Sequence, residues 1–360
     1  MPRPIRATVS AAALAHNLLV AKAYAGRAKV WAVLKANAYG HGLERAARAL
    51  EAADGFAVLD FQEAARLRLA GVSRPILMLE GFFKPVDLPL LAKYALTPVI
   101  HNPEQVELLK AADLGGEIDV YLKANSGMNR LGFAVDALRA AYNSVRMHRQ
   151  VRNITLMTHF ADADGPAGVQ AQMQWLEEMA RPIEGLAKAA RSVANSAALI
   201  RFPEARGDWV RPGIMLYGCS PFADKSAAQL DLQPVMTLSS ELIATQHLQA
   251  GERIGYGFSY EAVGEMTIGV VACGYADGYP RHAPTGTPVL VNGKRTRTVG
   301  RVSMDMICID ISDIHDAYIG SPVTLWGAGL PADEVATAAG TVSYELLCAL
   351  APRVPVAEIA

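Results

Sequence analysis

The sequence lacks the cysteine and histidine patterns that mark metal-binding and disulfide-rich proteins. Its four cysteines are Cys219, Cys273, Cys308 and Cys348, and no two are close enough to form a CxxC pair. Neither a zinc knuckle nor a disulfide framework is indicated, and the metalloprotease pattern HExxH is absent as well. We therefore expect no metal site, and we expect all four cysteines to be buried free thiols.

An excess of one charge and long apolar runs are also lacking. The 34 Lys and Arg residues nearly balance 35 Asp and Glu, so the net charge is −1, which argues against a nucleic-acid partner. The best membrane candidate, residues 88–100, contains Lys93 and Pro98 and is shorter than the ~20 residues that a spanning helix needs. The first residues, MPRPIRATVS, lack the apolar stretch of a signal peptide. We expect a cytoplasmic protein without membrane contact.

What the sequence does contain is a repeated strand–helix pattern. The 360 residues are 51% hydrophobic and 19% charged, as in an ordinary globular protein of about two domains. Short apolar runs that read as strands occur at residues 30–34, 56–59, 75–79, 97–100, 118–123, 154–159, 192–196 and 209–217. Helical patterns lie between most of them, at residues 43–53, 62–70, 103–112, 135–149 and 168–189. Eight such units predict an α/β fold, a (β/α)8 barrel of the TIM type.

The pattern changes after Gln233 and Pro234. Six short runs with β character follow, at residues 236–245, 266–273, 287–291, 296–302, 306–311 and 323–326, and Asn292-Gly293 is typical of a tight hairpin turn. Two short helices are expected at residues 332–339 and 343–350. We predict a barrel over residues 9–232 and a mostly β C-terminal domain over residues 233–360. The opening segment 5–9 pairs with that domain or begins the barrel.

Polar side chains follow several of the predicted barrel strands. Catalytic groups of such barrels lie at the C-terminal ends of the strands. Lys35 directly follows the first barrel run, and a desolvated lysine has a lowered pKa and can form a Schiff base; a solvated lysine at a strand end is the alternative. Other polar residues in the same position are Lys123, Asn125, Arg130, Thr158, His159, Asp162, Asn195, Ser196 and Arg211. This cationic set predicts an anionic ligand, a phosphate or a carboxylate.

Nine segments, in order along the chain, resemble those of the alanine racemases. AVLKANAYGHG is similar to the pyridoxal-phosphate lysine motif of that family, and KANSGMNRLG resembles its KxDTGMxRLG segment. The other seven are THFADAD, ANSAA, VRPGIMLYG, GYG, GYADGYP, GRVSMDM and SYELLC…RVP. The resemblance runs from Val33 to Pro355 and implies a barrel followed by a β domain, which agrees with the pattern of strands and helices.

The resemblance implies an isomerase that interconverts L-alanine and D-alanine with pyridoxal 5′-phosphate as cofactor. Lys35 would bind the cofactor and serve as the base on one face of the substrate, and Tyr256 from the partner chain of a homodimer would serve the other face. Arg211 would face the pyridine nitrogen, and His159 would orient Arg211 by a hydrogen bond. Because an arginine does not readily give up a proton, the ring would remain unprotonated.

The resemblance also implies how the cofactor and the substrate are held. The phosphate would be bound by hydroxyls and backbone amides, those of Tyr39, Ser196, Gly213, Ile214 and Tyr344. The substrate carboxylate would be bound by Arg130 and by the backbone amide of Met304, and Tyr275 of the partner chain would line the entrance. Lys123 is often carbamylated in the family, which makes it an anion that positions Arg130. Either Lys123 is modified in this way here, or another anionic group lies between Lys123 and Arg130.

Two positions depart from the family pattern. Asn125 stands where the family commonly has an aspartate, which removes a carboxylate near Lys123 and Arg130. Ser192 stands where a histidine is often found, and we assign it no catalytic role.

Three other functions fit the same resemblance less well. The alternatives are an amino-acid racemase of broader specificity, an amino-acid decarboxylase on the same scaffold, and a non-catalytic carrier of the cofactor. Arg211 and Tyr256 count against a decarboxylase, and the C-terminal β domain counts against a carrier. The product D-alanine would serve peptidoglycan synthesis, or the reaction would serve D-alanine catabolism.

Overall fold

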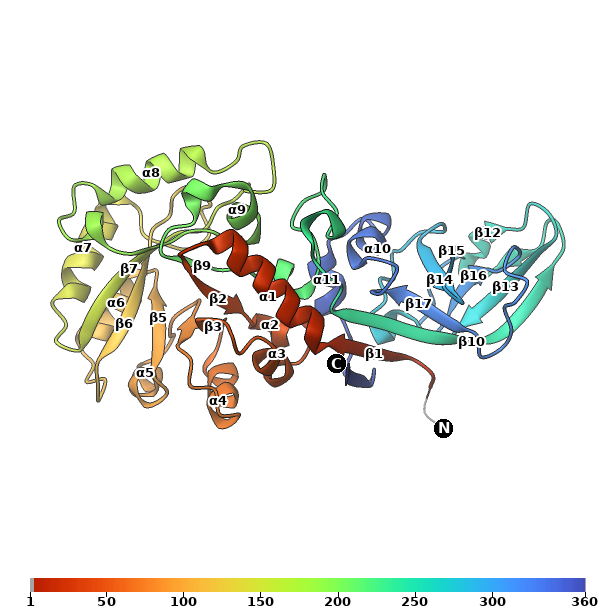
Figure 1. Cartoon of the computed structure of the whole chain (residues 1–360), viewed down its shortest axis with the longest axis horizontal. Coiled ribbons are helices and arrows are strands. Elements are labelled where there is room, and N and C mark those ends of the chain that lie inside the picture. Colours follow the sequence, from red (N-terminus) through yellow and green to blue (C-terminus); the bar gives the residue numbers. More distant parts are fainter. Residues whose placement is uncertain (1–2, 360) are drawn as a thin grey trace.

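The computed structural model describes residues 3–359 and consists of two bodies that lie side by side along the long axis (Figure 1). The first body is a parallel sheet in the order β8-β7-β6-β5-β4-β3-β2-β9. Its strands are β2 (Lys29–Val33), β3 (Gly55–Val58), β4 (Ile76–Met78), β5 (Leu96–Ile100), β6 (Ile118–Lys123), β7 (Val151–Met157), β8 (Arg191–Ser192) and β9 (Trp209–Val210). The backbone amide of Asp208 donates to the carbonyl of Arg191 at 2.9 Å. The two end strands therefore meet, and the predicted eight-stranded barrel is confirmed.

Helices cover the outside of this barrel. They are α1 (Ala11–Ala25), α3 (Leu43–Ala49), α4 (Phe61–Leu69), α5 (Leu88–Lys93), α6 (Pro103–Lys110), α7 (Val135–Arg146), α8 (Gln170–Ala180) and α9 (Ser196–Arg201), whereas α2 (Lys35–Tyr39) is a short left-handed turn that follows β2. Ser10, Asp60, Asn102 and Asn195 accept hydrogen bonds from the first turns of α1, α4, α6 and α9. Such capping satisfies amides that have no partner within a helix.

Some boundaries differ from the prediction. The run 209–217 is a strand only over Trp209–Val210, and Ile214–Tyr217 forms a buried 3₁₀ helix, because a short buried apolar run does not distinguish the two structures. Helix α8 ends at Ala180, before Pro182, since proline has no amide proton to continue the helical hydrogen bonds. Helix α1 was not predicted, and its alanine-rich sequence explains why its apolar face is indistinct.

The second body is mostly β, as predicted. Its large sheet has the order β13-β16-β15-β14-β17-β10-β1-β18, and β10 also pairs with β13. The strands are β1 (Arg6–Ser10), β10 (Met236–Leu248), β13 (Met266–Val271), β14 (Pro288–Val291), β15 (Lys294–Val299), β16 (Ile307–Asp310), β17 (Pro322–Trp326) and β18 (Val356–Ile359), and a small ribbon joins β11 (Arg253–Ile254) to β12 (Tyr260–Glu261). Helices α10 (Ala332–Ala338) and α11 (Ser343–Cys348) lie between this sheet and the barrel (Figure 1).

Two local features of this domain can be compared with the expectations from the sequence. Strand β1 pairs antiparallel with β10 and parallel with β18, so the opening segment belongs to the β domain and not to the barrel. Asn292 and Gly293 both have positive φ and connect β14 to β15 as the predicted two-residue turn.

The burial of the cysteines and the length and apolar character of the helices can also be compared with the predictions. Cys219 and Cys273 are buried and Cys308 is half-buried, but Cys348 is exposed. The expectation of burial is wrong for Cys348 because Leu346 and Leu347 form the buried face of α11. Within residues 3–359, no helix combines the length and the apolar character needed to cross a membrane.

Asn17 of α1 joins the barrel to the segment that leads into the β domain. Its side chain is fully buried. The Nδ2 group donates to the carbonyls of Leu216 at 3.1 Å and Gln233 at 2.9 Å, and the Oδ1 atom accepts from the amide of Gln233 at 2.8 Å. Three backbone groups at the domain junction therefore depend on one side chain.

We expect the substitution Asn17→Leu, which keeps the volume of the side chain, to lower the free energy of unfolding by about 2–4 kcal/mol, because it leaves these backbone groups buried without partners. Urea denaturation would measure the change. The exposed Leu19 of the same helix provides the control, and Leu19→Ala should change stability by less than about 0.5 kcal/mol. Equal stability of Asn17→Leu and the parent chain would contradict this account.

Candidate active site

A cavity of about 760 Å³ lies at the C-terminal ends of the barrel strands. Ten of the residues predicted for the site line it: Lys35, Tyr39, Lys123, Arg130, His159, Ser196, Arg211, Gly213, Ile214 and Tyr344. Residues from α10 and α11 form a further wall, so the β domain contributes to the cavity of its own chain.

Lys35 stands at the start of a left-handed turn directly after β2. The four residues that follow it, Ala36 to Tyr39, all have φ between 52° and 56°. This conformation costs roughly 1–2 kcal/mol for each residue that is not glycine, so the surrounding structure must maintain it. Glu63 accepts from the amide of Asn37 at 3.2 Å, and the side chain of Asn37 accepts from the amide of Leu43 at 3.0 Å.

Helix α11 packs directly on this turn. A Cβ atom on Gly40 would lie 2.1 Å from the carbonyl oxygen of Leu347, so the two backbones approach as closely as a glycine permits. The turn thus places Lys35 and Tyr39 on the cavity, between the barrel and the β domain.

The Lys35 amine lies in an environment that disfavours its charged form. Burial, followed by the positive charge of Arg130, lowers the pKa of Lys35, while Glu80 acts in the opposite direction. A lysine with a lowered pKa has a larger neutral fraction, and the neutral amine is the nucleophile that attacks a carbonyl.

An uncharged cradle of hydroxyl and amide groups occupies another part of the cavity. The amide of Gly213 donates to Oγ of Ser196 at 2.9 Å. A Cβ atom on Gly213 would lie 2.6 Å from the hydroxyl of Tyr39, so only glycine leaves this space open. The Tyr39 ring stacks on Tyr217 with a centroid distance of 4.6 Å and lies 6.1 Å from the ring of Tyr344. Hydroxyls and amides in such a cradle suit a phosphate group.

Arg211 is buried at the end of β9, and neighbouring acceptors fix its guanidinium. It donates to Oγ of Ser192 and to the carbonyl of Thr158, both at 2.7 Å, and to the carbonyl of Val193 at 3.2 Å. Nδ1 of His159 lies 3.4 Å from the same guanidinium. Burial lowers the pKa of Arg211 to about 10. Ser192, for which no catalytic role was predicted, accepts this hydrogen bond and so helps to hold Arg211.

His159 is kept neutral by its surroundings. Burial and the positive charge of Arg211 hold the pKa of this imidazole well below its usual 6.5. A neutral ring can accept a hydrogen bond at Nδ1, whereas a protonated ring would repel the guanidinium. At 3.4 Å this contact is longer than the other three contacts of Arg211, and the neutral ring supplements them.

Lys123 lies in the most cationic part of the cavity. Burial, and then Arg211 and Arg130, lower the pKa of Lys123 to about 8. The nearby Asn125 organises the loop that leads to Arg130, because its Oδ1 accepts from the amide of Asn129 at 3.0 Å. The residue that departs from the family pattern therefore has a structural role in this chain.

Acidic residues on the cavity wall were not predicted. Glu80 follows β4, and it opposes the lowering of the pKa of both Lys35 and Lys123. Asp333 at the start of α10 accepts from the amide of Ser220 at 2.9 Å, and burial raises its pKa. Glu80 stands at a strand end, which is the same sequence signal that identified the other polar residues predicted for the site. Asp333 has no comparable sequence signal.

Three predicted site residues do not line this cavity. Tyr256, Tyr275 and Met304 belong to the β domain and have exposed fractions of 70%, 39% and 53%. Tyr256 stands between β11 and β12. Strand β12 lies in the part of the β domain that is away from the barrel (Figure 1). A single chain therefore does not bring these residues to its own Lys35.

The lowered pKa of Lys123 predicts a pH-dependent cost in stability. The folded pKa of about 8 lies below the ordinary 10.5, so the cost is complete below pH 8 and disappears as the pH rises towards 10.5. In bicarbonate-free buffer without cofactor, we expect Lys123→Met to raise the free energy of unfolding at pH 7 by about 1–3 kcal/mol. Urea titrations at pH 7 and pH 10.5 would measure the gain, and a gain independent of pH would contradict the assignment.

Comparison with known proteins gives one consistent result. Family models for the N-terminal and the C-terminal domain of alanine racemase match residues 9–221 and 235–357. The alanine racemase of Paraburkholderia phytofirmans is 55% identical over 357 residues, covering 99% of both chains. That of Ralstonia nicotianae is 55% identical over 363 residues, covering 99% of this chain and 95% of the relative.

Solved structures of alanine racemases are also similar to this chain. The crystal structure of the biosynthetic alanine racemase from Pseudomonas aeruginosa superposes with a TM-score of 0.94 at 47% identity, and the alanine racemase structure from Acinetobacter baumannii with 0.93 at 38% identity. Each comparison covers 99% of this chain and 100% of the other. With the strand-end lysine, the buried arginine and the two-domain fold, these matches establish that the chain belongs to the alanine racemase family of isomerases.

Proposed function

We propose that the protein interconverts L-alanine and D-alanine as a homodimer with pyridoxal 5′-phosphate as its cofactor. The observation that carries the proposal is the single cavity that joins Lys35, Arg211 and the Ser196–Gly213 cradle. The 55% identity to curated alanine racemases over nearly the whole chain supports the choice of substrate.

The residues of the cavity fit this cofactor at three points. The amine of Lys35, with its lowered pKa, suits a covalent bond to the aldehyde carbon. The cradle of Tyr39, Ser196, Gly213, Ile214 and Tyr344 suits the phosphate. Arg211 would face the ring nitrogen. When bound, the cofactor withdraws electrons from the α-carbon of the substrate and so acidifies its hydrogen.

Arg211 would affect the reaction because it does not donate a proton to the ring nitrogen of the cofactor. Its pKa of about 10 keeps the guanidinium charged near neutral pH, so it does not transfer a proton to the ring nitrogen. Its acceptors on Thr158 and Ser192 hold it in one orientation. An unprotonated ring is a weaker electron sink, which disfavours side reactions such as transamination, and it also distinguishes this site from that of a decarboxylase.

Two bases on opposite faces of the substrate would carry out the proton exchange. Nζ of Lys35 would take or give the proton on one face. The phenol of Tyr256 from the partner subunit would act on the other face, since Tyr256 is exposed and does not line the cavity of its own chain. The backbone amide of Met304 from the partner subunit, together with Arg130, would bind the substrate carboxylate. The exposed positions of these β-domain residues support a shared site.

Lys123 would be modified by carbon dioxide. A pKa of about 8 leaves a fraction of the amine neutral near physiological pH. The neutral amine adds to carbon dioxide and releases one proton, which gives a carbamate anion. That anion would replace the repulsion between Lys123 and Arg130 by an attraction and would orient Arg130 towards the substrate.

The product D-alanine would supply peptidoglycan synthesis, or the same reaction would begin D-alanine catabolism, in the cytoplasm. A racemase of broader specificity would use the same residues. The test is chiral analysis of the products after separate incubation of the cofactor-loaded protein with L-alanine, L-serine, L-lysine and L-arginine. Rapid conversion of L-alanine alone supports the proposal; conversion of several amino acids would indicate the broader racemase, and the absence of any D-isomer would overturn it.

We expect Tyr256→Phe to reduce the racemisation rate at least about 100-fold, because removal of a positioned acid–base group costs typically 10²–10⁴-fold. The visible absorbance of the cofactor bound to Lys35 should be unchanged, since the proposed cofactor contacts come from Lys35, Arg211 and the phosphate cradle and not from Tyr256. The exposed Tyr318, in the same domain, provides the control, and Tyr318→Phe should retain full activity. Full activity in Tyr256→Phe would remove this residue from the mechanism.

A further inference from the structure

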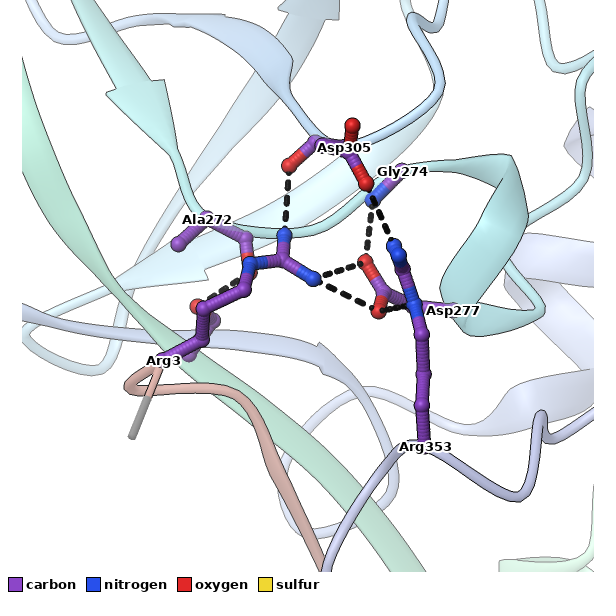
Figure 2. A network of polar contacts seen from close by, with 7 residues as sticks. Arg3, Ala272, Gly274, Asp277, Asp305 and Arg353 are labelled. Atoms are coloured by element: carbon purple, nitrogen blue, oxygen red, sulfur yellow. Dashed lines mark hydrogen bonds and ion pairs between the residues drawn. The ribbon is translucent and has the colours of Figure 1, made fainter. Parts of the chain in front are cut away.

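A network of charged side chains in the β domain surrounds one buried carboxylate (Figure 2). Asp277 has no solvent exposure. It accepts from Nη1 of Arg3 at 2.9 and 3.2 Å, from Nε of Arg353 at 2.7 Å and from the amide of Gly274 at 2.9 Å. The two arginines also reach Asp305: Arg353 binds its carboxylate and Arg3 its backbone carbonyl, both at 2.7 Å.

Such a network is costly to build into a fold. A carboxylate taken out of water must be paired and hydrogen-bonded, and a well-packed apolar group is often at least as stabilising. The three segments that meet here are remote in sequence, since the N-terminal segment supplies Arg3 and the segment after α11 supplies Arg353. An apolar contact would also join these segments, but it would not fix their relative positions by directed bonds. The network therefore differs from an apolar contact in the fixed geometry that it imposes on the segments.

The network holds two loops against each other. The amide of Tyr275 donates to the carbonyl of Ser303 at 3.1 Å, and the amide of Ala276 donates to the carbonyl of Met304 at 3.0 Å. A Cβ atom on Gly274 would lie 2.3 Å from the carbonyl oxygen of Met304, so the loops are in direct backbone contact. Asp277 belongs to one loop and Asp305 to the other, and the arginines bridge them.

We propose that Arg3, Asp277 and Arg353 are positioning residues that set the Met304 amide and the Tyr275 side chain for the substrate bound in the partner subunit. This inference rests on the proposed function, in which these two loops complete the partner's cavity. None of these three residues lines the cavity of its own chain. The network acts through the loops, and a displacement of about 1 Å at such a distance can cost on the order of 100-fold in rate.

The positioning role of Arg353 depends on its planar guanidinium group. Nε binds Asp277 and Nη2 binds Asp305, so one planar group fixes the separation of the two loops. A lysine ammonium in its place would retain the charge but could not hold both carboxylates in a fixed plane.

The first experiment compares the homodimers of Arg353→Ala, Arg353→Lys and Arg3→Ala in racemisation of L-alanine. We expect KM to rise at least ~10-fold in Arg353→Ala, with an intermediate rise in Arg353→Lys, and kcat to change less than KM. Cofactor affinity, followed by visible absorbance, should be unchanged, because the cofactor contacts lie in the other domain and on α11. Arg152→Ala, which removes an exposed two-contact arginine–aspartate pair of the barrel, is the matched control and should leave KM unaltered.

The second experiment separates an effect on the partner's site from an effect on the chain's own site. In a heterodimer of Arg353→Ala and Lys35→Ala chains, carrying different affinity tags, one site combines an intact Lys35 with intact partner loops. We expect this heterodimer to show the parent KM at about half the parent kcat, which is one working site in two. Arg3→Ala retains the Arg353 contacts and tests the same point in a chain that keeps most of the network.

Three results would overturn the inference. An unchanged KM in both Arg353→Ala and Arg3→Ala would make the network a purely structural element. A KM that stays high in the heterodimer would show that Arg353 acts on its own cavity through α11. Failure of the unsubstituted protein to racemise alanine is a different result, because it overturns the proposed function itself and the positioning role with it.

Discussion

The candidate site depends on positive charge held where water is excluded. Arg211 is buried and keeps its orientation through the acceptors Ser192, Thr158 and Val193. Burial, and then the same charge, lower the pKa of His159 and Lys123. Burial and this guanidinium therefore favour the neutral forms of both neighbours, and the strained turn after β2 brings Lys35 to the same cavity, where burial and Arg130 lower its pKa. An anionic cofactor and the carboxylate of the substrate would both be attracted to this environment.

The sequence predicted the parts of this arrangement that have a periodic or positional signal. The barrel strands were visible as apolar runs, and the rule that functional groups follow such strands located Lys35, Lys123, His159 and Arg211. The left-handed turn of Ala36 to Tyr39 was not predictable, because alanine gives no sign of positive φ and the conformation is imposed by Glu63 and α11. The same holds for Ser192 and Asp333, whose importance comes from partners far away in the sequence.

The β domain has two faces with different tasks. Helices α10 and α11 close the cavity of their own chain, while Tyr256, Tyr275 and Met304 point to the surface. Arg353 follows α11 and bonds to the loops of Tyr275 and Met304, so the wall of one cavity is joined by a few residues to the groups proposed for another. In the proposed homodimer, the domain would therefore link two sites, whereas the barrel would supply the cofactor-binding groups of only one.

The position of β1 has a consequence for the order in which the chain can fold. Strand β1 is made before the barrel strands, but its neighbours β10 and β18 begin at Met236 and Val356. The barrel can form while translation continues, since its strands lie between residues 29 and 210. One edge of β1 stays unpaired until β10 has been made, and the other edge until β18 has been made. During synthesis β1 is thus exposed to aberrant strand pairing, and β18 completes the sheet that protects it.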